Sequence, residues 1–116
     1  MSKIVIALGG NALGKTPSEQ LSILEGVSKV IVDLIEKGNK VILTHGNGPQ
    51  VGQISLAMEY ASNGSVGTPS MPFAECGSMS EGYIGYHIEQ SIMNELNKRD
   101  IDKSIVTLIT EVLVDK

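Results

Sequence analysis

Two glycine-rich stretches, each directly after a short apolar run, constrain the fold of this chain more than any other feature. The first, "GGNALG", follows residues 3–8, and the second, "HGNGPQVG", follows residues 40–44. Both apolar runs are short, rich in β-branched residues and almost continuously apolar, which is typical of buried strands in a parallel sheet. The sequence therefore predicts two strands that end in the same way.

A helix is predicted between these two strands. Thr16 is a suitable N-cap, Pro17 occupies the first helical position, and Glu19 completes a capping box. Gly38 provides the C-terminal stop. Apolar residues recur between these ends at helical spacing, so one face of this helix is expected to be buried: Leu24, Val27, Ile31, Leu34 and Ile35.

The rest of the chain continues the alternation. Asn47 or Gly48 is predicted to cap a second helix, and a loop rich in Gly, Pro, Ser and Asn covers 62–73. A third helix is expected over about 74–98, where Ile84, Ile88, Ile92 and Leu96 recur at i+4, and a third strand is expected over 104–115. This order predicts an α/β fold, a three-layer α/β/α sandwich with a mainly parallel sheet.

The two glycine-rich loops are predicted to form one binding site. Loops at the carboxyl ends of parallel strands lie at one edge of the sheet, so "GGN" and "GNG" are expected to face the same cleft. Exposed N–H groups and a helix N-terminus favour an anion, and the side chains of Asn11 and Asn47 add donors. We therefore expect an oxyanion-rich ligand that carries a phosphoryl group.

Composition narrows the class of protein. The net charge is −4 and Lys and Arg are not clustered, which argues against a nucleic-acid partner. No apolar run approaches the roughly 20 residues that span a membrane, and no signal-peptide pattern begins the chain, so a cytoplasmic location is expected. Cys76 is the single cysteine and is expected to be a reduced core thiol.

Charged side chains are scarce near the two loops. Lys15 and His45 are the candidate cations; we expect Lys15 to be solvated and His45 to make a structural hydrogen bond. Neither motif contains Asp or Glu, so no metal site is expected within them.

Two other classes of protein stay open. One is a nicotinamide-dinucleotide-binding domain, because "GNGPQVG" fits a looser glycine pattern, and the other is a non-catalytic α/β binding or assembly module.

Four stretches carry a family resemblance. In this order, "VIALGGNAL", "THGNGPQVG", "MSEGYIGY" and "LITEVLVD" resemble the N-terminal part of the carbamate kinases, in the amino acid kinase superfamily, over nearly the whole chain. Acetylglutamate and aspartate kinases typically carry Lys two residues before the first Gly-Gly pair. Ala7 stands there in this chain, which favours the carbamate kinases.

The resemblance implies reversible phosphoryl transfer between ATP and carbamate, with magnesium, giving carbamoyl phosphate and ADP. In the fermentative direction this reaction makes ATP at the end of arginine breakdown. The resemblance also implies a homodimer joined through the region of Tyr83, Tyr86 and His87. It assigns carbamate and phosphoryl binding to six loop residues: Gly9, Gly10, Asn11, Gly46, Asn47 and Gly48.

Members of this family are much longer than 116 residues. The resemblance therefore implies that residues 1–116 are the carbamate- or carbamoyl-phosphate-binding part of a truncated amino acid kinase-like fold. The nucleotide-binding half, with the catalytic lysines and an acidic residue, would lie beyond Lys116. We expect the chain alone to be inactive and to hold no nucleotide tightly.

Overall fold

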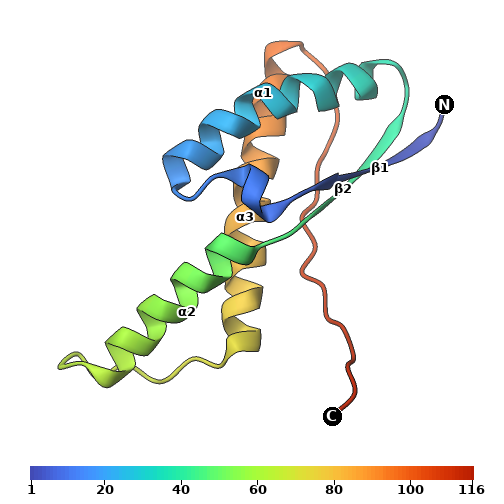
Figure 1. The fold of residues 1–116 in the computed structure, drawn as a ribbon. Coiled ribbons are helices and arrows are strands. Elements are labelled where there is room, and N and C mark those ends of the chain that lie inside the picture. Colours follow the sequence, from blue (N-terminus) through green and yellow to red (C-terminus); the bar gives the residue numbers. More distant parts are fainter.

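The computed structural model describes residues 1–9 and 12–116, and its strands and helices alternate along the chain (Figure 1). Both predicted strands 3–8 and 40–44 and all three predicted helices are present. The elements are β1 (Lys3–Leu8), the short 3-10 helix η1 (Gly10–Leu13), α1 (Pro17–Glu36), β2 (Lys40–His45), α2 (Gly48–Asn63) and α3 (Phe73–Lys98).

The sheet consists of β1 and β2, paired in parallel along their full length. One face is half-buried against a core between α1 and α3, and its apolar residues are Ile6, Leu8, Val41 and Leu43. Val5 and Ile42 on the opposite face are 64% and 52% exposed, because no described element covers that face. The described residues thus contribute the sheet and one helical layer of the predicted three-layer arrangement.

The N-terminus of α1 is capped as the sequence predicts. The Glu19 N–H donates to Thr16 Oγ1 at 3.2 Å, and Pro17 occupies the first turn. The Glu19 carboxylate accepts from the Lys15 N–H at 2.8 Å, one residue before the usual partner in a capping box. At the other end Gly38 has φ +87°, which suits glycine after a helix.

The hydrophobic core lies where α1 crosses α3. The i+4 series predicted for α3 is buried throughout, together with Leu24 and Ile31 of the α1 stripe and one residue of η1, whereas Val27 and Ile35 of that stripe are partly buried. Close packing of these aliphatic side chains is the main stabilising contact of the described residues. The core residues are Leu13, Leu24, Ile31, Val32, Ile84, Ile88, Ile92 and Leu96.

Helix α2 contacts α3, begins beside it and then diverges from it (Figure 1). Val51 is buried, whereas Leu56 and Tyr60 are 69% and 81% exposed. The N-terminal part of α2 is therefore its most buried part. None of the described helices is both long and apolar enough to cross a membrane.

The prediction of a strand over 104–115 is wrong. This segment has no regular secondary structure and runs alongside α3 (Figure 1). Thr107 Oγ1 donates to Glu89 Oε2 at 2.7 Å, and the Thr110 N–H donates to Glu81 Oε2 at 3.0 Å. These bonds hold the segment on α3 instead of on the edge of β2. Gly85 permits the approach, since a Cβ there would collide with the methyl group of Thr107.

Candidate functional site

The two glycine-rich loops leave the sheet side by side. Leu8 at the end of β1 is the register partner of His45 at the end of β2, and the Gly46 N–H extends the pairing by donating to the Leu8 carbonyl at 3.0 Å. The prediction that both loops lie at one edge of the sheet is confirmed for the residues that the structure describes. Gly10 and Asn11, two of the predicted site residues, lie outside the described residues.

Two glycines of these loops are not required by the packing of the protein. Gly9 has φ −66°, which any residue adopts, and a Cβ built on Gly9 or Gly48 would meet no atom within 4 Å. Glycine at such positions leaves open space beside the backbone. By contrast, the Gly46 N–H is already used in pairing with Leu8, which makes Gly46 an anchor of the second loop.

Asn47 is the N-cap residue of α2, but its side chain does not cap the helix. Instead, Asn47 Nδ2 donates to Ser80 Oγ of α3 at 2.8 Å. One of its two amide hydrogens is thus committed to the protein. The backbone N–H groups of Gly48 and Gln50, in the first turn of α2, have no acceptor among the described residues.

Two glutamines of α2 tie the first loop to the second. Gln50 Nε2 donates to the carbonyl of Gly14 at 3.2 Å, and Gln53 Nε2 donates to the carbonyl of Lys15 at 2.9 Å. Gly14 itself has φ +79°. The segment that follows η1 is therefore fixed against α2. The sequence did not identify Gln50, Gln53 or Ser80, because their partners are 33 to 38 residues away.

The site offers N–H donors and few charges. His45 Nδ1 lies 3.1 Å from the Gly46 carbonyl, so the predicted structural hydrogen bond is confirmed. Lys15 lies near the loops, and its main chain is bound to Glu19 and Gln53. Across residues 1–9 and 12–116, no three His, Cys, Asp or Glu side chains gather to hold a metal ion. Such a site suits a small anion held by backbone and amide groups.

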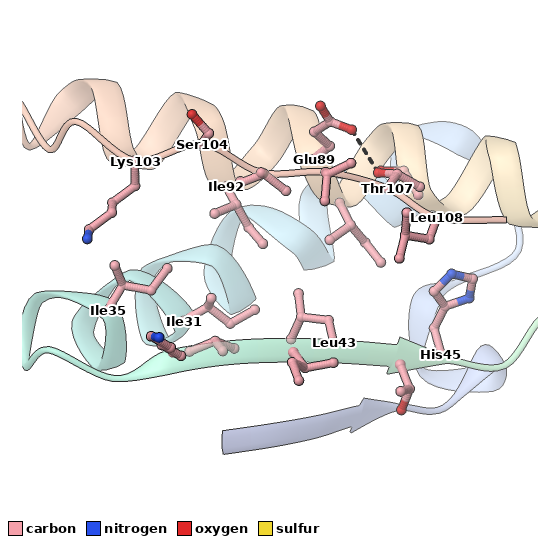
Figure 2. A pocket seen from close by; sticks show the side chains of 18 of the residues that line it. Ile31, Ile35, Leu43, His45, Glu89, Ile92, Lys103, Ser104, Thr107 and Leu108 are labelled. Atoms are coloured by element: carbon pink, nitrogen blue, oxygen red, sulfur yellow. Dashed lines mark hydrogen bonds between the residues drawn. The ribbon is translucent and has the colours of Figure 1, made fainter. Parts of the chain in front are cut away.

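A separate cavity of about 610 Å³ lies between β2, α1, α3 and residues 103–110 (Figure 2). Figure 2 shows Ile31, Ile35, Leu43, Ile92 and Leu108 lining it, with His45 at the end nearest the loops. Its walls are mainly aliphatic, which does not suit a phosphoryl group. The cavity marks the gap between β2 and the segment 104–115, which was predicted to be a strand.

Comparison with known proteins identifies the family. The family model described as "Amino acid kinase family" matches residues 2–114. The chain belongs to the amino acid kinase family. The predicted amino acid kinase-like fold is confirmed by solved structures, including that of the Giardia carbamate kinase. That structure has a TM-score of 0.85 and 40% sequence identity, and the match covers 96% of this chain and 39% of the Giardia chain.

Two further relatives make the likeness to carbamate kinases specific. The chain is 54% identical over 116 residues to the carbamate kinase of Staphylococcus epidermidis, and this match covers 100% of the chain but 37% of that protein. The structure of a Giardia lamblia carbamate kinase bound to AMP-PNP has a TM-score of 0.77 and 38% identity, covering 85% of this chain and 35% of that one. The chain thus spans well under half of the length of the carbamate kinases that it matches.

The Tyr and His residues in the middle of α3 form an aromatic cluster. The Tyr83 and His87 rings pack edge to face with centroids 5.0 Å apart. Burial lowers the pKa of His87 and raises the pKa of Tyr83, because burial disfavours a charged imidazole and a charged phenolate. Tyr86 is 65% exposed. The interface predicted for this region of the kinase fold stays a prediction.

Proposed function

We propose that residues 1–116 are the N-terminal, carbamoyl-phosphate-binding part of a carbamate kinase. The observation that carries this proposal is the meeting of two glycine-rich loops at one sheet edge, where Gly9 and Gly48 leave open space beside the backbone. Phosphoryl transfer asks little covalent chemistry of the protein and needs donors placed around the phosphoryl oxygens. Backbone N–H groups at a helix N-terminus supply that kind of donor.

The loop residues then have distinct roles. Gly48 and Gln50 donate backbone N–H groups of the first turn of α2 to phosphoryl oxygens, and Asn47 adds its second amide hydrogen. Gly46 anchors the loop through its bond to Leu8. The first loop closes the other side of the ligand through Gly9, Gly10 and Asn11, with glycine giving the ligand close access to the main chain.

The full reaction in this proposal is reversible phosphoryl transfer between ATP and carbamate, giving carbamoyl phosphate and ADP. The likeness to carbamate kinases supports the substrates, and the relative bound to AMP-PNP supports the nucleotide. Magnesium accompanies the nucleotide in this reaction, but the loops do not fit a magnesium site because they hold no carboxylate. The lysines and the acidic residue that complete the reaction lie beyond Lys116, so this chain alone gives no turnover.

The same proposal places the protein in arginine breakdown in the cytoplasm, as a homodimer joined through the region of Tyr83, Tyr86 and His87. Tyr86 supports the proposed dimer, because a 65% exposed aromatic residue is suited to an interface.

A non-catalytic α/β module and a nicotinamide-dinucleotide-binding domain are the competing functions. Ligand binding separates these classes, whereas turnover of the isolated chain does not.

The test is an amide NMR titration of the 116-residue chain with carbamoyl phosphate, with NAD as the comparison ligand. We expect shifts concentrated at residues 9–11 and 46–50 with carbamoyl phosphate and none there with NAD. A well-dispersed spectrum that ignores carbamoyl phosphate at millimolar concentration would contradict the proposal and favour the non-catalytic module. Shifts with NAD confined to residues 46–52 would favour the dinucleotide-binding domain.

A further inference from the structure

Asn47 is an N-cap residue whose side chain is turned away from its helix. Asparagine at this position usually accepts a hydrogen bond from the second or third N–H of the helix. Asn47 has φ −147° and ψ 13°, and makes no such bond. In the same chain Thr16 has φ −120° and ψ 158°, and caps α1 in the usual way. Something outside α2 must therefore hold Asn47 in its conformation.

Ser80 fixes both the position and the orientation of the Asn47 amide. Ser80 is completely buried, and its Oγ donates its single hydrogen to the Gly77 carbonyl at 2.5 Å. The hydroxyl oxygen then has only acceptor capacity left. Asn47 must present Nδ2 to Ser80, as the 2.8 Å bond shows, and its Oδ1 is thereby turned away from Ser80.

The first turn of α2 leaves one possible target for an Asn47 cap. Pro49 is the second residue of α2 and has no N–H. The third residue, Gln50, has an N–H without an acceptor among the described residues. A capping Asn47 would consume this N–H, whereas an Asn47 held by Ser80 leaves it open.

We infer that Ser80 is a positioning residue for the loop 46–48: it draws the Asn47 amide onto α3 and so keeps the Gln50 N–H open to a ligand. Ser80 does not touch the ligand and acts only through Asn47. The identity of the ligand rests on the proposed function, but the effect of Ser80 on Asn47 does not. Two experiments therefore test the two statements separately.

The first experiment needs no ligand. In the Ser80→Ala chain, Asn47 returns to capping, and amide hydrogen exchange at Gln50 slows by about three- to tenfold, the factor expected for one added hydrogen bond. Ser78→Ala is the matched control, because Ser78 lies on the same helix and donates to the carbonyl three residues earlier, at 2.7 Å, but is exposed and makes no hydrogen bond to the loop 46–48. Unchanged or faster exchange at Gln50 in Ser80→Ala would overturn the inference.

The second experiment measures carbamoyl phosphate binding by NMR titration. We expect Ser80→Ala to weaken binding at least about fivefold, while Ser78→Ala binds as the unmodified chain does. Because Ser80 acts through Asn47, the double variant Asn47→Ala/Ser80→Ala binds no more weakly than Asn47→Ala alone. Additive losses would overturn the inference. If the unmodified chain binds no carbamoyl phosphate, the proposed function fails and the exchange experiment alone decides the role of Ser80.

Discussion

At the scale of single residues, the glycines of this chain divide into those that the fold requires and those that it does not. Gly14 has φ +79°, and a Cβ there would lie 2.9 Å from the Glu19 Cβ, whereas a Cβ on Gly9 would meet nothing within 4 Å. We expect Gly14→Ala to lower the free energy of unfolding by at least about 1 kcal/mol and Gly9→Ala to change it by less than about 0.5 kcal/mol. Urea denaturation measures both, and equal losses would contradict this division.

His87 gives the chain a pH-dependent stability. Burial lowers its pKa below the ordinary value of about 6.5, so the unfolded chain takes up the proton first as the pH falls. The contribution of His87 to stability is therefore present above about pH 6.5 and is lost as the pH falls toward the folded-state pKa. Denaturation midpoints at pH 7.5 and 5.5 test this: His87→Gln should flatten the difference, and His45→Gln should keep it. An unchanged difference in His87→Gln would contradict this account.

At the scale of the elements, one arginine joins the C-terminal ends of α1 and α3. Arg99 donates to Asp33 at 2.6 Å, to Glu95 at 3.0 Å and to the carbonyl of Lys29 at 3.2 Å. The hydrogen bond to Asp33 is the main cause of the raised pKa of the Arg99 guanidinium. A lysine cannot make these bonds at once, because it lacks the planar fork of donors.

We therefore expect Arg99→Lys to lower the thermal unfolding midpoint, and added salt to reduce this difference because it screens the ion pairs. Lys98→Ala is the control, since Lys98 makes no ion pair with the described residues. A midpoint in Arg99→Lys equal to that of the unmodified chain would show that the two helices are held by their apolar contacts alone.

The sequence predicted those elements whose signals are local. The Thr16 cap, the Gly38 stop and the buried series of α3 follow from neighbours within a few residues, and the structure confirms them. The strand over 104–115 has strand-like composition, but pairing is a tertiary property, and Thr107 and Thr110 bind glutamates of α3 instead. In the site, the loops were predictable from their glycines, whereas Ser80 and Gln50 were not, because their bonds cross 33 and 36 residues.

At the scale of the whole molecule, the chain is more open than a compact domain of its size. Its radius of gyration is 16.5 Å, against roughly 13 Å for a compact domain of about 100 residues. The uncovered face of the sheet and residues 106–114 expose apolar side chains, including Val5, Ile42, Leu108 and Leu113. Exposed apolar surface of this kind is typical of regions that contact another protein segment.

The most direct test of the central claim is the dissociation constant of carbamoyl phosphate, measured by isothermal titration calorimetry for the unmodified chain, Gly9→Ala and Gly52→Ala. Gly52 is the matched control, because a Cβ there also meets no atom within 4 Å, but it lies inside α2, beyond the proposed ligand-binding residues 9–11 and 46–50. Binding by the unmodified chain and Gly52→Ala, with a loss of about tenfold or more in Gly9→Ala, is the result predicted here, since a methyl group would occupy the space of a phosphoryl oxygen. No binding at millimolar ligand, or equal constants for all three chains, would contradict the claim that the paired loops hold a phosphoryl group.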